Sequence, residues 1–124
     1  MLHFKLEEFD SPDLPGTGYV MDKTFLNLLD RARDAAGIPF VITSGFRTLE
    51  HQNELKKQGY PVSKSSSHLK GLAADISCTD SASRLIIIES LLYVGFRRIG
   101  ISGKGKFIHV DLDKDKKQDV IWVY

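Results

Sequence analysis

The sequence predicts a single α+β domain in which about three helices pack with a largely antiparallel sheet. Apolar residues recur at helical spacing in separate stretches, and short β-prone runs lie between and after them. The last of these runs alternate around a glycine-rich turn, as paired strands do. At 124 residues the chain can close one hydrophobic core but not two, so residues 1–124 are expected to form one domain.

Two of the expected helices fall in the N-terminal half. A short element at Leu2 to Phe9 is followed by a stretch rich in turn-forming residues. Asp22 is a suitable N-cap, and apolar residues then recur at three- and four-residue steps until Gly37. Phe40 to Thr43 is a short β-prone run, and Thr48 to Lys57 is expected to be helical with its first residue as the cap.

A loop, a strand and the third helix are expected next. The Ser/Lys cluster from Ser63 to Ser67 is predicted to be a loop, and Gly71 to Ile76 a strand. Thr79 or Asp80 is expected to cap the following helix, which ends at Gly95. Its apolar stripe is expected to face the core and consists of Leu85, Ile88, Leu91 and Leu92.

The C-terminal quarter is expected to complete the sheet. Arg98 to Ile101 and Phe107 to Leu112 flank the glycine-rich turn and are predicted to pair as antiparallel strands. A charged turn follows, and Val120 to Tyr124 is predicted to be a last strand or a docking segment.

The composition argues against several classes of function. With 17 basic and 16 acidic residues the formal charge is +1, so we expect no nucleic-acid partner and no attraction to an anionic membrane. The first eight residues include acids and lack the apolar stretch of a signal peptide, so we expect synthesis in the cytoplasm without one. No apolar run approaches the roughly 20 residues that span a bilayer, so no membrane insertion is expected. The single cysteine, Cys78, cannot form an internal disulfide.

Two histidines and an aspartate, His68, Asp75 and His109, are candidate ligands of one zinc ion. Neutral imidazole and carboxylate are ligands that zinc accepts, and three of them leave a fourth position open. Water at an open position has its pKa lowered to about 7, which suits hydrolysis of an amide. A structural zinc site would more often be closed by cysteines. Spacing alone supports the set only weakly, because many unrelated chains contain such a pattern.

The wording of three segments resembles the M15 zinc peptidases, which are the D-Ala-D-Ala carboxypeptidase-like enzymes. Ser66 to Asp75 resembles their S-x-H-x-x-G-x-A-x-D signature, and Thr43 to Thr48 contains a segment similar to S-G-[FY]-R. Phe107 to Asp111 is similar to their F-x-H-x-D segment. The opening Phe9 to Asp13 and the closing Ile121-Trp122 resemble small, single-domain, phage-associated members.

This resemblance implies the DD-peptidase/hedgehog-like zinc fold and a set of residue roles. His68, Asp75 and His109 would bind Zn²⁺, while Ser66 and Arg47 would hold the peptide and its developing oxyanion. The permanently charged guanidinium of Arg47 independently suits a carboxylate or an oxyanion. The implied activity is hydrolysis of peptidoglycan stem peptides, of the D-Ala-D-Ala carboxypeptidase or endopeptidase type. We expect a monomer that acts on the bacterial cell wall.

The chain departs from the family pattern at one position. Many relatives place a Glu or Asp general base three residues before the last histidine ligand, whereas this chain has Lys106. Asp111 is a candidate replacement, because residues two apart on a strand point to one side. It could equally orient His109 through the free ring nitrogen of that histidine. The departure also leaves open a non-catalytic, zinc-containing module that binds cell-wall peptide or a protein partner.

Other readings of these residues have less support. A serine hydrolase built from Ser66, His68 and Asp75 would lack the G-x-S-x-G segment and the usual residue order. Nothing near Cys78 in the sequence would lower the pKa of its thiol. A structural phage component without metal would require the three motifs to be accidental or decayed.

Overall fold

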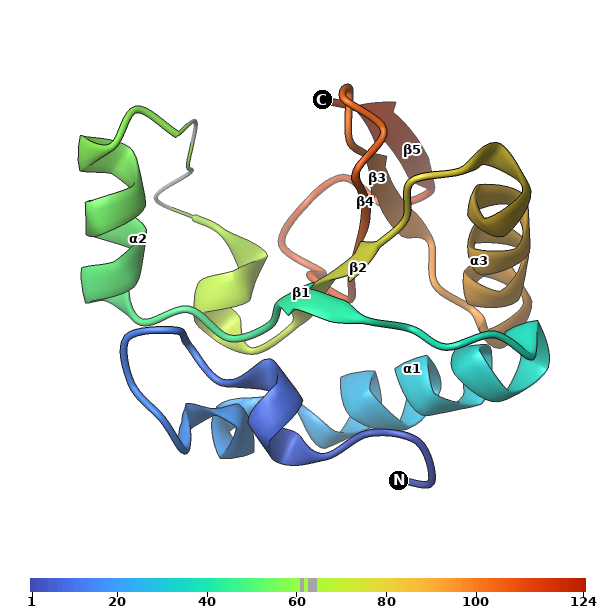
Figure 1. Cartoon of the computed structure of the whole chain (residues 1–124), viewed down its shortest axis with the longest axis horizontal. Coiled ribbons are helices and arrows are strands. Elements are labelled where there is room, and N and C mark those ends of the chain that lie inside the picture. The colour runs from blue at the N-terminus through green and yellow to red at the C-terminus, as the bar shows by residue number, and fades with distance from the viewer. Residues whose placement is uncertain (61, 63–64) are drawn as a thin grey trace.

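A five-stranded sheet with the order β1-β2-β4-β3-β5 forms the centre of the computed structural model, which describes residues 1–60, 62 and 65–124 (Figure 1). The strands are β1 (Ile42–Ser44), β2 (Ala73–Ser77), β3 (Arg98–Ile101), β4 (Phe107–Asp111) and β5 (Val120–Val123). The helices are α1 (Lys23–Ala36), α2 (Leu49–Lys57) and α3 (Ser81–Val94). Short 3-10 turns occupy Leu6–Phe9, Thr17–Val20 and Ser67–Lys70. The predicted α+β class is confirmed.

Side-chain caps fix the starts of all three described α-helices. The side chain of Asp22 accepts a hydrogen bond from the Phe25 N–H at 2.9 Å, and Thr48 accepts one from His51 at 3.1 Å. Of the two candidates for the third helix, Asp80 is the cap. Gly37 and Gly95 end α1 and α3 in the left-handed conformation that favours glycine. The three helices predicted from the sequence are thus confirmed.

The core lies between the sheet and the pair of helices α1 and α3, which pack against each other (Figure 1). Phe25 of α1 meets Phe96 edge to face, with ring centroids 5.7 Å apart. In Figure 1, α2 lies apart from this pair, beyond β1. The face of the sheet that α1 and α3 leave uncovered is therefore available for a site.

The strands pair mostly as predicted. β3 and β4 are antiparallel, with Gly100 opposite His109, and β2 and β4 are antiparallel, with Asp75 opposite His109. The last segment is a strand, β5, which runs parallel to β3. Trp122 of β5 lies over Gly100, where an added Cβ would approach the indole to 2.8 Å. That glycine therefore lets the last strand bring its aromatic side chains onto the sheet.

The predicted stripe of the third helix is wrong in part. Leu91 is fully buried, but Leu85 is 66% exposed and Leu92 is 37% exposed, while Ile87, outside the stripe, is buried. The helix is apolar on most of its sides, so the spacing of its leucines did not determine which side faces the core. No helix in the described part of the chain is long and apolar enough to cross a bilayer.

Several element boundaries differ from the prediction by one or two residues. β1 begins at Ile42, not at Phe40. β2 begins at Ala73, because Gly71 ends a 3-10 turn with a φ of 70°. The predicted loop from Ser63 to Ser67 is described only in part, because residues 63 and 64 lie outside the described residues and Ser67 already belongs to the 3-10 turn.

Candidate metal centre and active site

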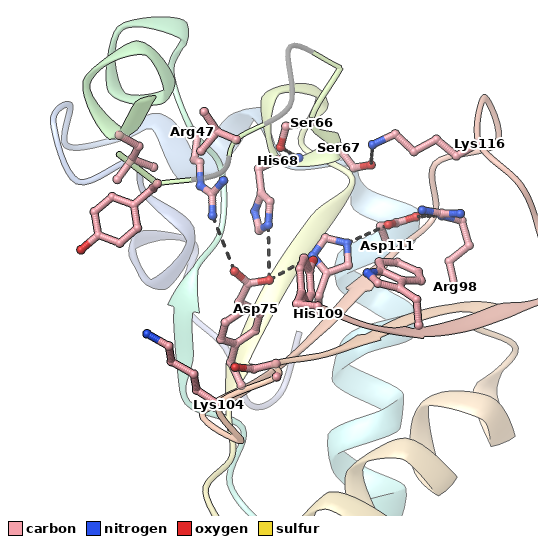
Figure 2. Close-up of a pocket in the computed structure, with 18 residues that line it drawn as sticks. Arg47, Ser66, Ser67, His68, Asp75, Arg98, Lys104, His109, Asp111 and Lys116 are labelled. Carbon is pink, nitrogen blue, oxygen red and sulfur yellow. Dashed lines mark hydrogen bonds and ion pairs between the residues drawn. The ribbon is translucent and has the colours of Figure 1, made fainter. Parts of the chain in front are cut away.

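The three predicted ligands converge on one point of the sheet face. His68 comes from the 3-10 turn before β2, Asp75 from β2 and His109 from β4 (Figure 2). Oδ1 of Asp75 lies 3.3 Å from Nε2 of His68 and 3.0 Å from Nδ1 of His109. Each residue offers one ligand atom, and all these atoms lie within 4.8 Å of one another. The three side chains are buried, so the packing of the fold, and not a chance contact at the surface, holds them together.

Local backbone structure explains the convergence. Asp75 and His109 are directly opposite each other on adjacent antiparallel strands, where side chains point to the same face. His68 lies on the turn that Gly71 ends, and a Cβ at Gly71 would come within 2.8 Å of the Val20 carbonyl oxygen. The glycine of the S-x-H-x-x-G segment is thus required for the approach of the turn that carries His68.

The S-G-F-R segment holds the ring of His68. Nδ1 of His68 lies 2.8 Å from the carbonyl oxygen of Gly45, and since a carbonyl only accepts, Nδ1 carries the proton. The N–H of Arg47 donates to the His68 carbonyl at 3.2 Å. A Cβ at Gly45 would lie 2.6 Å from the Phe9 Cα, so only glycine allows this approach. The unprotonated Nε2 of His68 therefore faces Asp75.

Asp111 holds the ring of His109 from the other side. Oδ2 of Asp111 lies 2.7 Å from Nε2 of His109, so Nδ1 of that ring is directed at Asp75. Oδ1 of Asp111 accepts from Nε of Arg98 at 2.7 Å and from the Asp113 N–H at 3.0 Å. The carboxylate is 1% exposed. These contacts fit the alternative in which Asp111 orients the ring of His109, and they do not support the role of general base.

The pKa values of the two histidines are shifted in opposite directions. Burial lowers the pKa of His68, which Asp75 offsets only in part. Burial also opposes protonation of His109, but the carboxylates of Asp111 and Asp75 outweigh it and raise its pKa. Asp75 is buried too, yet its contacts with the rings of His109 and His68 hold its pKa well below its usual range. Asp75 is therefore an anion between the two rings.

The donor set fits a zinc ion. Zinc bonds of about 2.0–2.2 Å in a tetrahedron separate neighbouring ligand atoms by roughly 3.3–3.6 Å. The two pairs that include Oδ1 of Asp75 are 3.3 and 3.0 Å apart, so a small adjustment would admit the ion. Each histidine has its other nitrogen engaged by an acceptor, as is usual for ligating histidines.

Arg47 lies beside the cluster, as Figure 2 shows. Its Nη2 is 3.6 Å from Oδ2 of Asp75, and its Nε donates to the Ser44 hydroxyl at 3.0 Å. Burial lowers the pKa of Arg47, although Asp75 opposes this shift. Ser66 caps the 3-10 turn, since its hydroxyl accepts from the His68 N–H at 3.3 Å. Both residues predicted to hold substrate thus lie at the site.

A cavity of about 800 Å³ opens over these residues and is lined largely by apolar surface. Among the described residues that line it, the carboxylates are those of Asp75 and Asp111. Lys106 does not line it; the residue is exposed, and its carbonyl accepts from the Cys78 N–H at 2.9 Å. Lys106, where the sequence departs from the expected family pattern, is therefore outside the described wall of this cavity.

Asp113 was missed by sequence reasoning. Its buried carboxylate accepts from the Ser67 hydroxyl at 2.7 Å and from Nζ of Lys70 at 3.0 Å, while Nζ of Lys116 lies 3.1 Å from the Ser67 oxygen. These contacts tie the turn that carries His68 to the segment after β4. The alternation of His109 with two aspartates at two-residue steps was the available signal.

The aromatic wall of the cavity was missed as well. Trp122 packs against His109 with ring centroids 5.5 Å apart, and the Arg98 guanidinium lies 4.8 Å from the Trp122 ring centroid. Tyr124 also lines the cavity, and burial of its phenol beside Asp75 raises its pKa to about 12. The alternation of the last strand could have indicated that these two side chains share a face.

Comparison with known proteins agrees with the geometry. No curated protein matches the chain. A family model described as Peptidase M15 matches residues 3–111, a span that contains all three candidate ligands, Arg47 and Asp111. Because the match covers most of the chain, the chain belongs to the Peptidase M15 family.

Proposed function

We propose that this chain is a zinc-dependent peptidase that hydrolyses peptide bonds in bacterial peptidoglycan stem peptides, and that it acts on the cell wall. The observation that carries the proposal is the convergence of His68, Asp75 and His109, with both rings oriented by acceptors on their other nitrogens. Membership in a peptidase family supports the reaction class. A bound zinc ion would supply an activated water and a positive charge beside the scissile carbonyl.

The protein's own groups would bind and orient the substrate. Arg47 is directed at the cluster, so its guanidinium suits either the substrate carboxylate or the oxyanion of the tetrahedral intermediate. Ser66 lines the same cavity and offers a hydroxyl two residues before the proposed ligand His68. The apolar part of the wall would exclude water from the stem peptide.

Asp111 is proposed to orient His109 and not to accept the proton. Its two oxygens are engaged by His109, Arg98 and the Asp113 backbone, and it lies on the far side of the His109 ring from Asp75. An acceptor in this position fixes the ring and raises the basicity of the ligating nitrogen.

The test is turnover by fully metallated protein. Zinc-loaded protein incubated with several purified stem peptides is expected to release D-alanine or to split the stem, as followed by mass spectrometry. His68→Ala, assayed beside it, is expected to give no product. Absence of turnover on every stem peptide from protein with one bound zinc would overturn the enzyme proposal.

A second candidate is a non-catalytic zinc module that binds cell-wall peptide or a protein partner. The observation that favours it concerns the general base. Among the described residues of the cavity wall, the side-chain carboxylates are those of Asp75, a proposed zinc ligand, and Asp111, which is proposed to orient His109, so neither is assigned as the base. Peptide binding by calorimetry without any product in the same sample would support this candidate over the peptidase.

A further inference from the structure

We propose that Tyr124 is a catalytic residue whose hydroxyl donates a hydrogen bond to the oxygen that becomes negative when the stem-peptide carbonyl is attacked. The inference rests on the proposed peptidase function. It assigns a second donor, beside Arg47, to the oxyanion. Tyr124 keeps its proton throughout, so the step makes and breaks no covalent bond at this residue.

The backbone of the last strand fixes Tyr124 at the cavity. Its N–H donates to the Ile101 carbonyl at 3.0 Å, which continues the parallel pairing of β5 with β3. A Cβ at Gly103 would lie 2.5 Å from the Tyr124 carbonyl oxygen, so the hairpin between β3 and β4 approaches this residue as closely as glycine permits. Tyr124 is therefore held on two sides by main chain.

Aromatic neighbours fix the ring. The centroid of the Tyr124 ring is 5.6 Å from that of Phe107, 6.1 Å from that of Trp122 and 6.4 Å from that of His109. Phe107 and His109 lie on the same face of β4, two residues apart. The ring thus packs beside a predicted metal ligand, although 60% of the residue is exposed. That exposure leaves one side of the phenol open to a substrate in the cavity.

The position and chemistry of the phenol suit a neutral donor. Tyr124 lines the same cavity as Asp75 and Arg47, and it reaches the cavity from the end of β5, whereas Arg47 reaches it from the segment before α2. A tyrosine hydroxyl is neutral near pH 7 and can donate a hydrogen bond to an acceptor placed in this cavity. A neutral phenol is a poor proton acceptor, so donation of a hydrogen bond is the role that its chemistry supports.

The experiment compares Tyr124→Phe with Tyr93→Phe, a matched control on α3 whose side chain is 80% exposed and outside the cavity lining. Loss of one oxyanion donor typically lowers kcat by about 100- to 1000-fold. We therefore expect Tyr124→Phe to lower kcat by about 100-fold with KM within about threefold, while zinc content and thermal unfolding stay unchanged. Tyr93→Phe is expected to match the unsubstituted protein.

A second readout separates donation in the transition state from binding of the substrate. A phosphinate analogue of the stem peptide mimics the tetrahedral intermediate, so its affinity is expected to fall by the same factor as kcat/KM. A raised KM with unchanged kcat, or unchanged phosphinate affinity, would overturn the assignment of Tyr124. An inactive unsubstituted protein would instead overturn the proposed function, and this inference with it.

Discussion

His68 and His109 are both buried and both directed at Asp75, but they are held by different kinds of acceptor. The second nitrogen of His68 meets the neutral carbonyl of Gly45, while that of His109 meets the anionic carboxylate of Asp111. Their pKa values accordingly move in opposite directions, down for His68 and up for His109. One candidate ligand is oriented by a backbone carbonyl and the other by a side-chain network, so the two should respond differently to mutation and to pH.

Removal of either imidazole ring should cause the largest loss of zinc affinity, and the loss should be similar for His68 and His109. His68→Ala and His109→Ala each delete one of three ligands, so zinc affinity should fall by more than the roughly 10- to 100-fold loss typical of outer partners. The measurement is a competition titration against a chelator of known affinity. A variant that retains the affinity of the unsubstituted protein would show that its histidine is not a ligand.

Asp111→Asn should distinguish the two histidines, because Asp111 contacts the ring of His109 and not that of His68. The amide still offers an oxygen to the His109 ring but loses the negative charge, so zinc affinity is expected to fall by about 10- to 100-fold. The ion pair with Arg98 is lost as well, and thermal unfolding should be followed in parallel. Asp119→Asn, which removes the exposed partner of Arg97, is the matched control and should leave zinc affinity unchanged. Equal affinity in both variants would contradict the orienting role of Asp111.

The pH dependence of zinc binding should come mainly from His109. Its pKa in the metal-free protein is raised above the ordinary value of about 6.5, so zinc must displace a proton there, whereas His68 is already neutral. Zinc affinity is therefore expected to rise with pH until His109 loses its proton. The stability that the raised pKa provides to the metal-free fold is present below the unfolded pKa and is lost as pH rises through the folded one.

Calorimetry in buffers of different ionisation enthalpy counts the protons released on zinc binding. Asp111→Asn removes a cause of the raised pKa, so it should lower the number of protons released near neutral pH. Proton release that is unchanged in this variant would contradict the assignment of the raised pKa to Asp111.

Ser67→Ala should have a smaller effect, confined to the His68 side. It removes the hydroxyl that joins the turn to Asp113, and the net contribution of such a hydrogen bond is about 0.5–1.5 kcal/mol. Unfolding midpoints should fall accordingly, with only a few-fold change in zinc affinity. A loss of affinity as large as that of Asp111→Asn would show that the turn, and not the strand, limits the geometry of the site.

Lys106→Ala should have the smallest effect of all. The side chain is exposed and does not line the cavity, so kcat, KM and zinc affinity are each expected to stay within about twofold. A large loss of activity would show that this position takes part in the reaction.

Local sequence signals were sufficient for most of the fold. The caps Asp22 and Thr48 and the terminators Gly37 and Gly95 act within one helical turn, so they can be identified without tertiary information. The direction of β5 could not be inferred, because its parallel pairing with β3 joins residues about twenty positions apart and depends on Trp122 covering Gly100. The facing side of α3 was also undetermined, because Leu85 and Leu91 are chemically equivalent.

For the site, motif wording identified the residues but not their arrangement. The ligands were named from their segments, whereas the role of Asp111 required knowing which nitrogen of His109 it meets. The contacts of Asp113 with Ser67 cross 46 residues of sequence, and no local pattern specifies such a pairing. Motifs thus record which side chains are needed, and the packing decides what each one does.

The close approach of Gly45 to Phe9 has a consequence for the N-terminal segment. The N–H of Phe46 donates to the Phe9 carbonyl at 2.9 Å, directly beside the carbonyl that holds His68. Docking of the first residues and ordering of the His68 ring are therefore thermodynamically linked, although the two regions are more than fifty positions apart. Any local opening that lifts Phe9 away releases that ring, and a ligand that needs the ring in place stabilises the docked N-terminus in return.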